Sequence, residues 1–157
     1  MRPASIFVFS IFVILPFAST LGDSVKCPQI ACASGLTLDA PENYRWLPGD
    51  YRFEMQIDGT PAQCKGKLPL KNCGLPSIVC TAARVNVSES GCALAPVSHG
   101  WGPIYFDSNP KELQITVFRN DHIIGEFKKK IKYQSNTPLD PKCGAVCLQA
   151  NERLNLK

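Results

Sequence analysis

The sequence predicts an all-β fold, an antiparallel β-sandwich stapled by four disulfides. Three observations lead to this class. Short runs alternate apolar and polar residues with the period of a strand, and turn-forming residues recur between these runs. Eight cysteines follow an N-terminal export segment. Helical periodicity is nearly absent, and Ala145 to Arg153 is the one segment suited to a short C-terminal helix.

Length and composition limit the class of protein. The chain has 157 residues, of which 45% are hydrophobic and 19% are charged. It is too short for a barrel enzyme or a two-domain nucleotide-binding enzyme, and too apolar for wholesale disorder. The formal net charge of +4 is mildly basic and indicates no nucleic acid as partner.

Residues 1–22 have the three parts of a secretory signal peptide. Arg2 gives a basic start, Ile6 to Leu15 form an apolar run, and small residues follow. A membrane anchor is the alternative, but a bilayer requires about 20 apolar residues. We expect cleavage between Ala18 and Gly22, and a single secreted, extracellular domain over residues 23–157 without a transmembrane segment.

The cysteines indicate an oxidising compartment. An even number in an exported chain predicts four disulfides. Zinc binding is the alternative, but no C-x2-C spacing supports it, and we predict no metal and no cofactor. We expect the two N-terminal cysteines to pair with the two C-terminal ones, because domain termini are often close in space, and the central four to pair among themselves. The cysteines are Cys27, Cys32, Cys64, Cys73, Cys80, Cys92, Cys143 and Cys147.

Two hairpins are the clearest elements of the sandwich. Tyr51 to Ile57 alternates apolar and polar residues, and Asp58-Gly59 predicts a tight turn into a return strand through Cys64 and Leu68. The second hairpin has strands over residues 113–118 and 123–133 around a turn at Asn120-Asp121.

The remaining segments are predicted less regularly. Residues 23–48 read as an irregular entry segment anchored by Trp46. Residues 78–87 read as one strand with Val79 and Val87 on the same face, and residues 88–103 as a loop before a short strand at 104–106. Strands of this number and spacing favour an immunoglobulin-like sandwich.

The sequence Asn86-Val87-Ser88 is an N-glycosylation acceptor. The strand alternation directs Asn86 to solvent, so we predict that this residue carries a glycan.

No catalytic motif emerges from the sequence. The two histidines, His99 and His122, lie in different predicted loops, and no G-x-S-x-G surrounds a serine. Oxidised cysteines leave no thiol nucleophile. A carboxylate pair of the glycosidase type stays open, because such a pair needs only spatial proximity. We therefore assign no catalytic residue.

Two candidate binding surfaces remain. Lys128, Lys130 and Lys132 share one face of a strand and could bind an acidic partner, although lysines also protect an edge strand from aggregation. His99, Trp101 and Tyr105 occupy a Gly-rich stretch that could stack on a sugar or anchor a protein, although Trp101 could instead fold onto the core.

Several motifs together resemble small secreted cysteine-rich proteins of basidiomycete fungi, a group that implies no particular activity. These motifs are Leu47-Pro48-Gly49-Asp50-Tyr51 leading to Asp58-Gly59, Cys64 with Leu68-Pro69-Leu70, Ser90-Gly91-Cys92-Ala93-Leu94, Asn109-Pro110 before Leu113-Gln114-Ile115-Thr116-Val117, and Pro141-Lys142-Cys143 to Cys147.

A second resemblance is to secreted lipid-binding β-sandwiches of the MD-2-related kind. Cys27-Pro28 and the late hairpin from Leu113 to Tyr133 carry it, and the cysteine spacing departs from that family after Cys32.

These observations favour a secreted, disulfide-stabilised, effector-like protein that binds an unknown protein or glycan at an extracellular surface. A lipid-binding sandwich is the alternative and would require an apolar cavity between the sheets.

Overall fold

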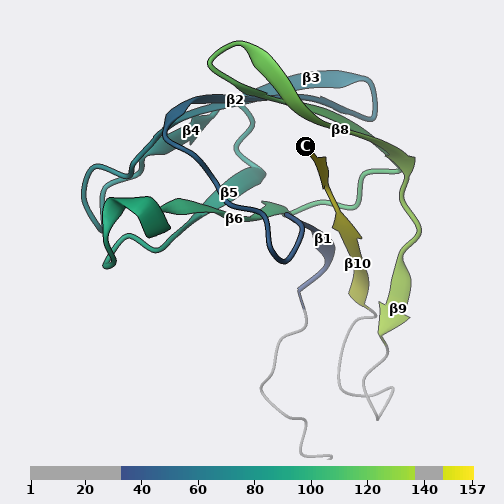
Figure 1. The fold of residues 1–157 in the computed structure, drawn as a ribbon. Helices are drawn as coiled ribbons and strands as arrows, with labels where there is room; N and C mark the ends of the chain where they lie inside the picture. Colours follow the sequence, from purple (N-terminus) through teal and green to yellow (C-terminus); the bar gives the residue numbers. More distant parts are fainter. Residues whose placement is uncertain (1–32, 137–146) are drawn as a thin grey trace, which may run out of the picture.

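The computed structural model describes residues 33–136 and 147–157, which form two β-sheets facing each other (Figure 1). The five-stranded sheet has the order β5-β6-β1-β10-β9, and the six-stranded sheet has the order β11-β8-β7-β2-β3-β4. The prediction of an all-β chain is confirmed. The strands are β1 (Gly35–Asp39), β2 (Gly49–Ile57), β3 (Thr60–Leu68), β4 (Ile78–Cys80), β5 (Val85–Ser90), β6 (Gly100–Phe106), β7 (Glu112–Arg119), β8 (His122–Lys130), β9 (Gln134–Asn136), β10 (Cys147–Arg153) and β11 (Asn155–Leu156).

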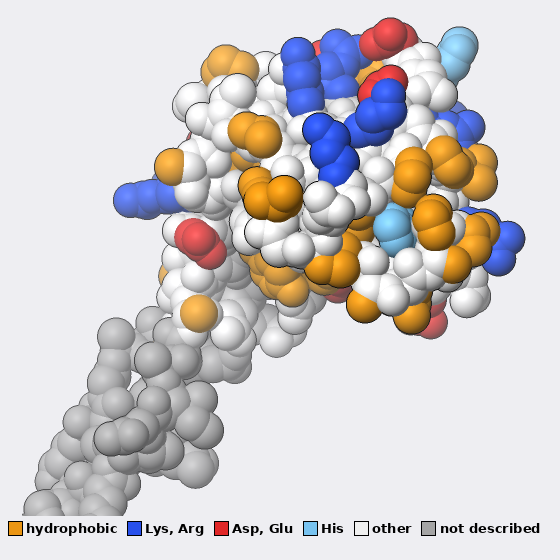
Figure 2. All heavy atoms as spheres, turned by 90° about the vertical axis from the view of Figure 1, so that its left-hand side faces the viewer, with side chains coloured by type: hydrophobic (Ala, Val, Ile, Leu, Met, Phe, Trp, Pro, Cys, Tyr) orange, Lys and Arg blue, Asp and Glu red, His pale blue; other side chains and the backbone are white. Residues whose placement is uncertain are grey.

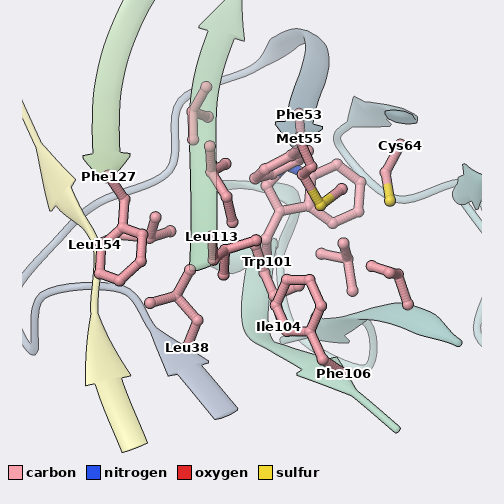
Figure 3. Close-up of a cluster of buried hydrophobic side chains, with 14 of the residues drawn as sticks. Leu38, Phe53, Met55, Cys64, Trp101, Ile104, Phe106, Leu113, Phe127 and Leu154 are labelled. Atoms are coloured by element: carbon pink, nitrogen blue, oxygen red, sulfur yellow. The ribbon is translucent and has the colours of Figure 1, made fainter. Parts of the chain in front are cut away.

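One hydrophobic core lies between the two sheets. The five-stranded sheet contributes Leu38 and Ile104, and the six-stranded sheet contributes Phe53 and Leu113; each of these side chains is at most 1% exposed. Figure 3 shows these side chains pointing into the space between the sheets. Their burial is the main force that holds the sheets together.

Both predicted hairpins are present. Asp58 and Gly59 have φ angles of 47° and 80°, and Asn120 and Asp121 have φ angles of 48° and 63°. Positive φ at both central residues is the geometry of the two-residue turn that suits twisted antiparallel strands. The Asp58 carboxylate also accepts hydrogen bonds from the backbone N–H groups of residues 111 and 112, which fixes the start of β7.

The second strand of the later hairpin departs from the expected alternation. The alternation in the sequence places Ile123 on the same face as Phe127 and Ile131, yet Ile123 is 53% exposed and its neighbour Ile124 is buried. The register shifts between Val117 and Phe118 on the facing strand, which moves the buried position by one residue.

Residues 78–87 do not form one strand. They divide into β4 in the six-stranded sheet and β5 in the five-stranded sheet, so Val79 is 68% exposed whereas Val87 is 2% exposed. The local alternation is real, but the chain crosses from one sheet to the other at residues 81–84. Asn86 lies on β5 and is exposed, as predicted.

Two further expectations were wrong because long-range pairing decides the structure. Gly35–Asp39 lies in the predicted irregular entry segment but forms β1, which pairs in parallel with β10. The short helix predicted over Ala145 to Arg153 is absent from its described part, since Cys147–Arg153 is β10. Cys147 and Ala150 are buried three residues apart, a spacing typical of a helix, yet pairing with β1 and β9 holds this segment extended.

The central cysteines pair among themselves. Cys64–Cys80 joins β3 to β4, and Cys73–Cys92 joins two loops at one end of the molecule. Cys147 is not a free thiol. The expectations for Cys27, Cys32 and Cys143, and for the signal peptide, fall outside the described residues. Within those residues, no helix has the length and apolar character needed to cross a membrane.

Candidate binding surface

Trp101 is a core residue rather than a surface contact. Its side chain is 2% exposed and packs edge-on against Tyr51 and Phe53, with ring centroids 5.8 and 6.5 Å apart. The predicted loop ends before it, because β6 begins at Gly100. The strand points the indole inward, so the binding role predicted for Trp101 is wrong.

His99 is also buried, at 8% exposure. Its Nδ1 accepts a hydrogen bond from the backbone N–H of Leu70 at 3.0 Å, and its Nε2 lies 3.1 Å from the carbonyl oxygen of Leu94. A ring that accepts at Nδ1 carries its proton on Nε2 and donates there. His99 therefore links the loop that contains Leu70 to the loop that contains Leu94, from the buried side of both. Its position does not support its predicted role as a ligand contact.

Tyr105 and the predicted lysine stripe lie on opposite sides of the molecule. Tyr105 is 41% exposed on the five-stranded sheet, opposite Asn86 in the register. Lys128 and Lys130 are exposed on the six-stranded sheet, and Lys132 lies past the end of β8. The structure therefore does not bring the predicted binding residues into one site.

The position of Lys128 and Lys130 on a sheet edge gives them a structural role. Along the outer edge of β8, β11 pairs only with Gly125 and Glu126, so the following residues lie on an edge. Lys128 and Lys130 on such an edge oppose pairing with another chain, as the alternative interpretation predicted. Lys129 points the other way, and its Nζ lies 2.6 Å from Glu152 Oε2 on β10, which links the two sheets.

A different surface stands out at the end of the molecule near β4. Five consecutive apolar residues, Ala93 to Val97, are all exposed, and the neighbouring loop exposes Leu75 and Pro76. Leu75, Leu94 and Val97 are 59%, 64% and 67% exposed. We call these residues the loop tip. Figure 2 shows hydrophobic side chains gathered on this side of the molecule, with Lys and Arg side chains beside them.

The loop tip is held outward by a rigid base. The disulfide Cys73–Cys92 joins its two loops, and His99 hydrogen-bonds to both. Within the second loop, the Leu94 N–H donates to the Gly91 carbonyl and the Ser98 N–H to the Ala95 carbonyl, both at 2.8 Å. These bonds hold the backbone of the second loop in a conformation that leaves its apolar side chains exposed.

Basic residues lie on two sides of the loop tip. A groove of about 730 Å³ on the outer face of the six-stranded sheet is lined by Pro76 of the loop tip, by Lys65, Lys67 and Lys71, and by the carboxylates of Asp50 and Asp121. On the other side, Arg45 lines a smaller hollow of about 350 Å³ together with Val97. We call these four cations the basic collar. Lys67 pairs with Asp50 at 3.3 Å, in an exposed pair that contributes little to stability.

The groove has one further cation that is already engaged. The Arg52 guanidinium lies 4.2 Å from the centre of the Phe118 ring and pairs with Glu54 at 2.8 Å and Asp121 at 3.3 Å. Arg52 has two carboxylate partners and an aromatic ring, and its side chain is only 31% exposed, whereas the Lys67 side chain is 65% exposed with one partner; Arg52 is therefore not counted in the basic collar.

The pKa shifts in the described residues fall on three tyrosines. Burial raises the pKa of Tyr44, Tyr51 and Tyr133; Tyr51 and Tyr133 pack in or against the core, and Tyr44 packs against Trp46. In residues 33–136 and 147–157, no group of three or more His, Cys, Asp or Glu side chains is placed to hold a metal ion. The loop tip and its basic collar present apolar and cationic contacts.

A feature of the sequence marks the loop tip, although a search for strand-like alternation does not detect it. Ala93 to Val97 is an apolar run between Cys92 and His99, with neither the alternation of a strand nor the periodicity of a helix. A run of this length on a surface normally has a function.

No known protein family, curated protein or solved structure matches the chain. The resemblances to basidiomycete secreted proteins and to MD-2-related sandwiches therefore stay predictions. The functional argument depends on the geometry of the chain itself.

Proposed function

We propose that this chain is a secreted, disulfide-braced binding protein that acts without catalysis at an extracellular surface, with the loop tip as its contact site. The observation that carries the proposal is the run Ala93 to Val97, exposed in full on a base fixed by Cys73–Cys92 and His99. Exposed apolar groups cost free energy in water, so a rigid display of them indicates a partner.

The core supports a surface site rather than an internal one. A lipid carrier would need an apolar cavity between its sheets. Leu38, Phe53, Ile104 and Leu113 occupy that space, and the groove of about 730 Å³ lies on the outer face of a sheet.

The finer architecture belongs to the same proposal. An immunoglobulin-like sandwich with two further disulfides among Cys27, Cys32, Cys143 and Cys147 would resist proteolysis outside a cell. A glycan on Asn86 would cover the five-stranded sheet, and it would leave the loop tip free.

Binding of the labelled protein to intact cells and to isolated cell-wall material tests the proposal. We expect the double variant L94S/V97S to lose at least about tenfold in binding, because each substitution removes one exposed aliphatic contact. The matched control is L148S, which changes an exposed leucine on β10 away from both loops (Figure 1). Equal binding by wild type and L94S/V97S would overturn the proposal.

A further inference from the structure

We infer that the partner of the loop tip is a bilayer containing anionic lipid, into whose interface the apolar side chains insert while the basic collar contacts the headgroups. This inference rests on the proposed function, since it names the partner of the same site. Its evidence is the residue chemistry of the tip, the arrangement of the cations and the rigidity of the base.

The residue types of the loop tip suit a lipid better than a protein. Its exposed side chains are aliphatic or proline: Leu75, Pro76, Leu94, Pro96 and Val97, with two alanines. Protein interfaces are typically anchored by Trp, Tyr and Arg, and leucine is uncommon among their strongest contacts. Aliphatic side chains without a polar end need no specific partner group and transfer readily into hydrocarbon.

The cations point to the same partner. Three of the four residues of the basic collar are lysines, namely Lys65, Lys67 and Lys71, and all three are exposed. Lysine is depleted in protein interfaces, whereas lysines beside an apolar surface are typical of proteins that bind anionic lipid. The four collar cations flank the tip on two sides, through the groove at Pro76 and the hollow at Val97.

The shape and stiffness of the tip allow shallow insertion. Gly91 has a φ of +75°, and a Cβ atom there would lie 2.1 Å from the carbonyl oxygen of Ser98, so only glycine permits this tight loop. The Cys73–Cys92 bridge and His99 keep both loops together during contact. A prearranged tip loses little conformational entropy on binding.

A few aliphatic side chains alone bind a bilayer weakly, so the anionic headgroups are needed for stable association. Each lysine near an anionic surface contributes about a fivefold increase in affinity. We therefore expect K65Q/K71Q to lower the affinity for anionic vesicles by about twenty-five-fold, and rising salt to lower it further. The matched control is K128Q/K130Q, which removes the same charge from β8, toward the other end of the same sheet, and should retain wild-type affinity.

The experiment measures binding of the full, disulfide-bonded protein to vesicles of phosphatidylcholine alone and of phosphatidylcholine with phosphatidylglycerol. Single tryptophan substitutions report insertion: L94W at the tip and L148W on β10 as control, with brominated lipid as the quencher. We expect binding to the anionic vesicles, quenching of L94W beyond that of wild type, and no extra quenching of L148W. Thermal unfolding of each variant shows whether the fold is retained.

The outcomes separate this inference from the proposed function. Absence of vesicle binding, together with tip-dependent binding to cells or cell wall, would overturn the lipid assignment and leave the binding function standing; a protein or glycan would then be the partner. Vesicle binding that L94S/V97S retains would also overturn the inference. Loss of tip dependence in both assays would overturn both. Anionic vesicle binding lost in L94S/V97S and weakened in K65Q/K71Q supports the assignment.

Discussion

The indole of Trp101 lies directly over Gly66. A Cβ atom at Gly66 would come within 2.7 Å of Trp101 Cη2 and within 2.9 Å of Ile78 Cβ. Because Gly66 on β3 has no side chain, the Trp101 ring from β6 of the five-stranded sheet can pack directly against the six-stranded sheet at this position. Glycine is required here for close approach rather than for an unusual backbone angle.

We expect Gly66→Ala to lower the free energy of unfolding by about 1–3 kcal/mol, because the added methyl group must displace the Trp101 ring or the Ile78 side chain. Urea denaturation measures the change. Lys65→Ala, an exposed change on the same strand, is the control and should shift stability by no more than about 0.5 kcal/mol. A Gly66→Ala variant as stable as the wild type would show that the tryptophan has room to move.

The loop tip should depend on its disulfide for order. The Cys73–Cys92 bridge closes a loop with a sequence separation of 19 residues, and a loop of that size corresponds to about 3 kcal/mol of stability in the chain-entropy treatment. We expect C73S/C92S to be destabilised by about that amount or less, and to be cleaved faster by protease within residues 91–98. Limited proteolysis followed by mass spectrometry locates the cleavage. Cleavage at an unchanged rate would mean that the bridge does not order the tip.

A third prediction concerns the buried hydrogen bond from the backbone N–H of Leu70 to His99 Nδ1, which is 3.0 Å long. We expect His99→Ala to cost about 1–3 kcal/mol, since this donor is left without a partner in the core. His99→Asn can present its amide oxygen near the position of Nδ1 and should recover part of the loss. Chemical denaturation compares the three proteins, and equal losses in both variants would argue against the hydrogen bond as the cause.

Much of the six-stranded sheet was predictable, because its two hairpins are local. Alternation from Tyr51 to Ile57 and the Asp58-Gly59 turn specify a strand pair within one short stretch. The five-stranded sheet was not predictable in this way. Its β1 pairs in parallel with β10, so Leu36 lies beside Ala150. A local sequence pattern cannot predict pairing between two strands that are so far apart in the sequence.

The site was predictable only in part, for a related reason. Trp101 stands in a Gly-rich stretch that looks like a loop, and its burial depends on Gly66, a residue of another sheet. The lysines of β8 were correctly expected to be exposed, but Tyr105 lies on the opposite sheet. The loop tip arises from two segments that only the folded chain and the Cys73–Cys92 bridge bring together.

Tyr133 gives a prediction for alkaline pH. Its hydroxyl donates to the Pro110 carbonyl at 2.9 Å, and burial, with a smaller effect from the Asp58 carboxylate, raises the pKa of Tyr133 to about 12. An unfolded tyrosine titrates near a pKa of about 10. Between these values the unfolded chain releases the proton while the folded protein retains it, so stability falls as pH rises through this window and is fully present below it.

Tyr133→Phe removes both the phenol and its hydrogen bond. We expect the variant to be less stable than wild type at neutral pH, by about 1 kcal/mol, and to lose less stability as pH rises above about 10. Phenolate absorbance during alkaline titration measures the ionisation, and the wild type minus variant difference isolates Tyr133 from Tyr44 and Tyr51, whose pKa values burial also raises. The assignment fails if the difference spectrum shows Tyr133 ionising at the pH of an unfolded tyrosine. It also fails if both proteins lose stability at the same rate with pH.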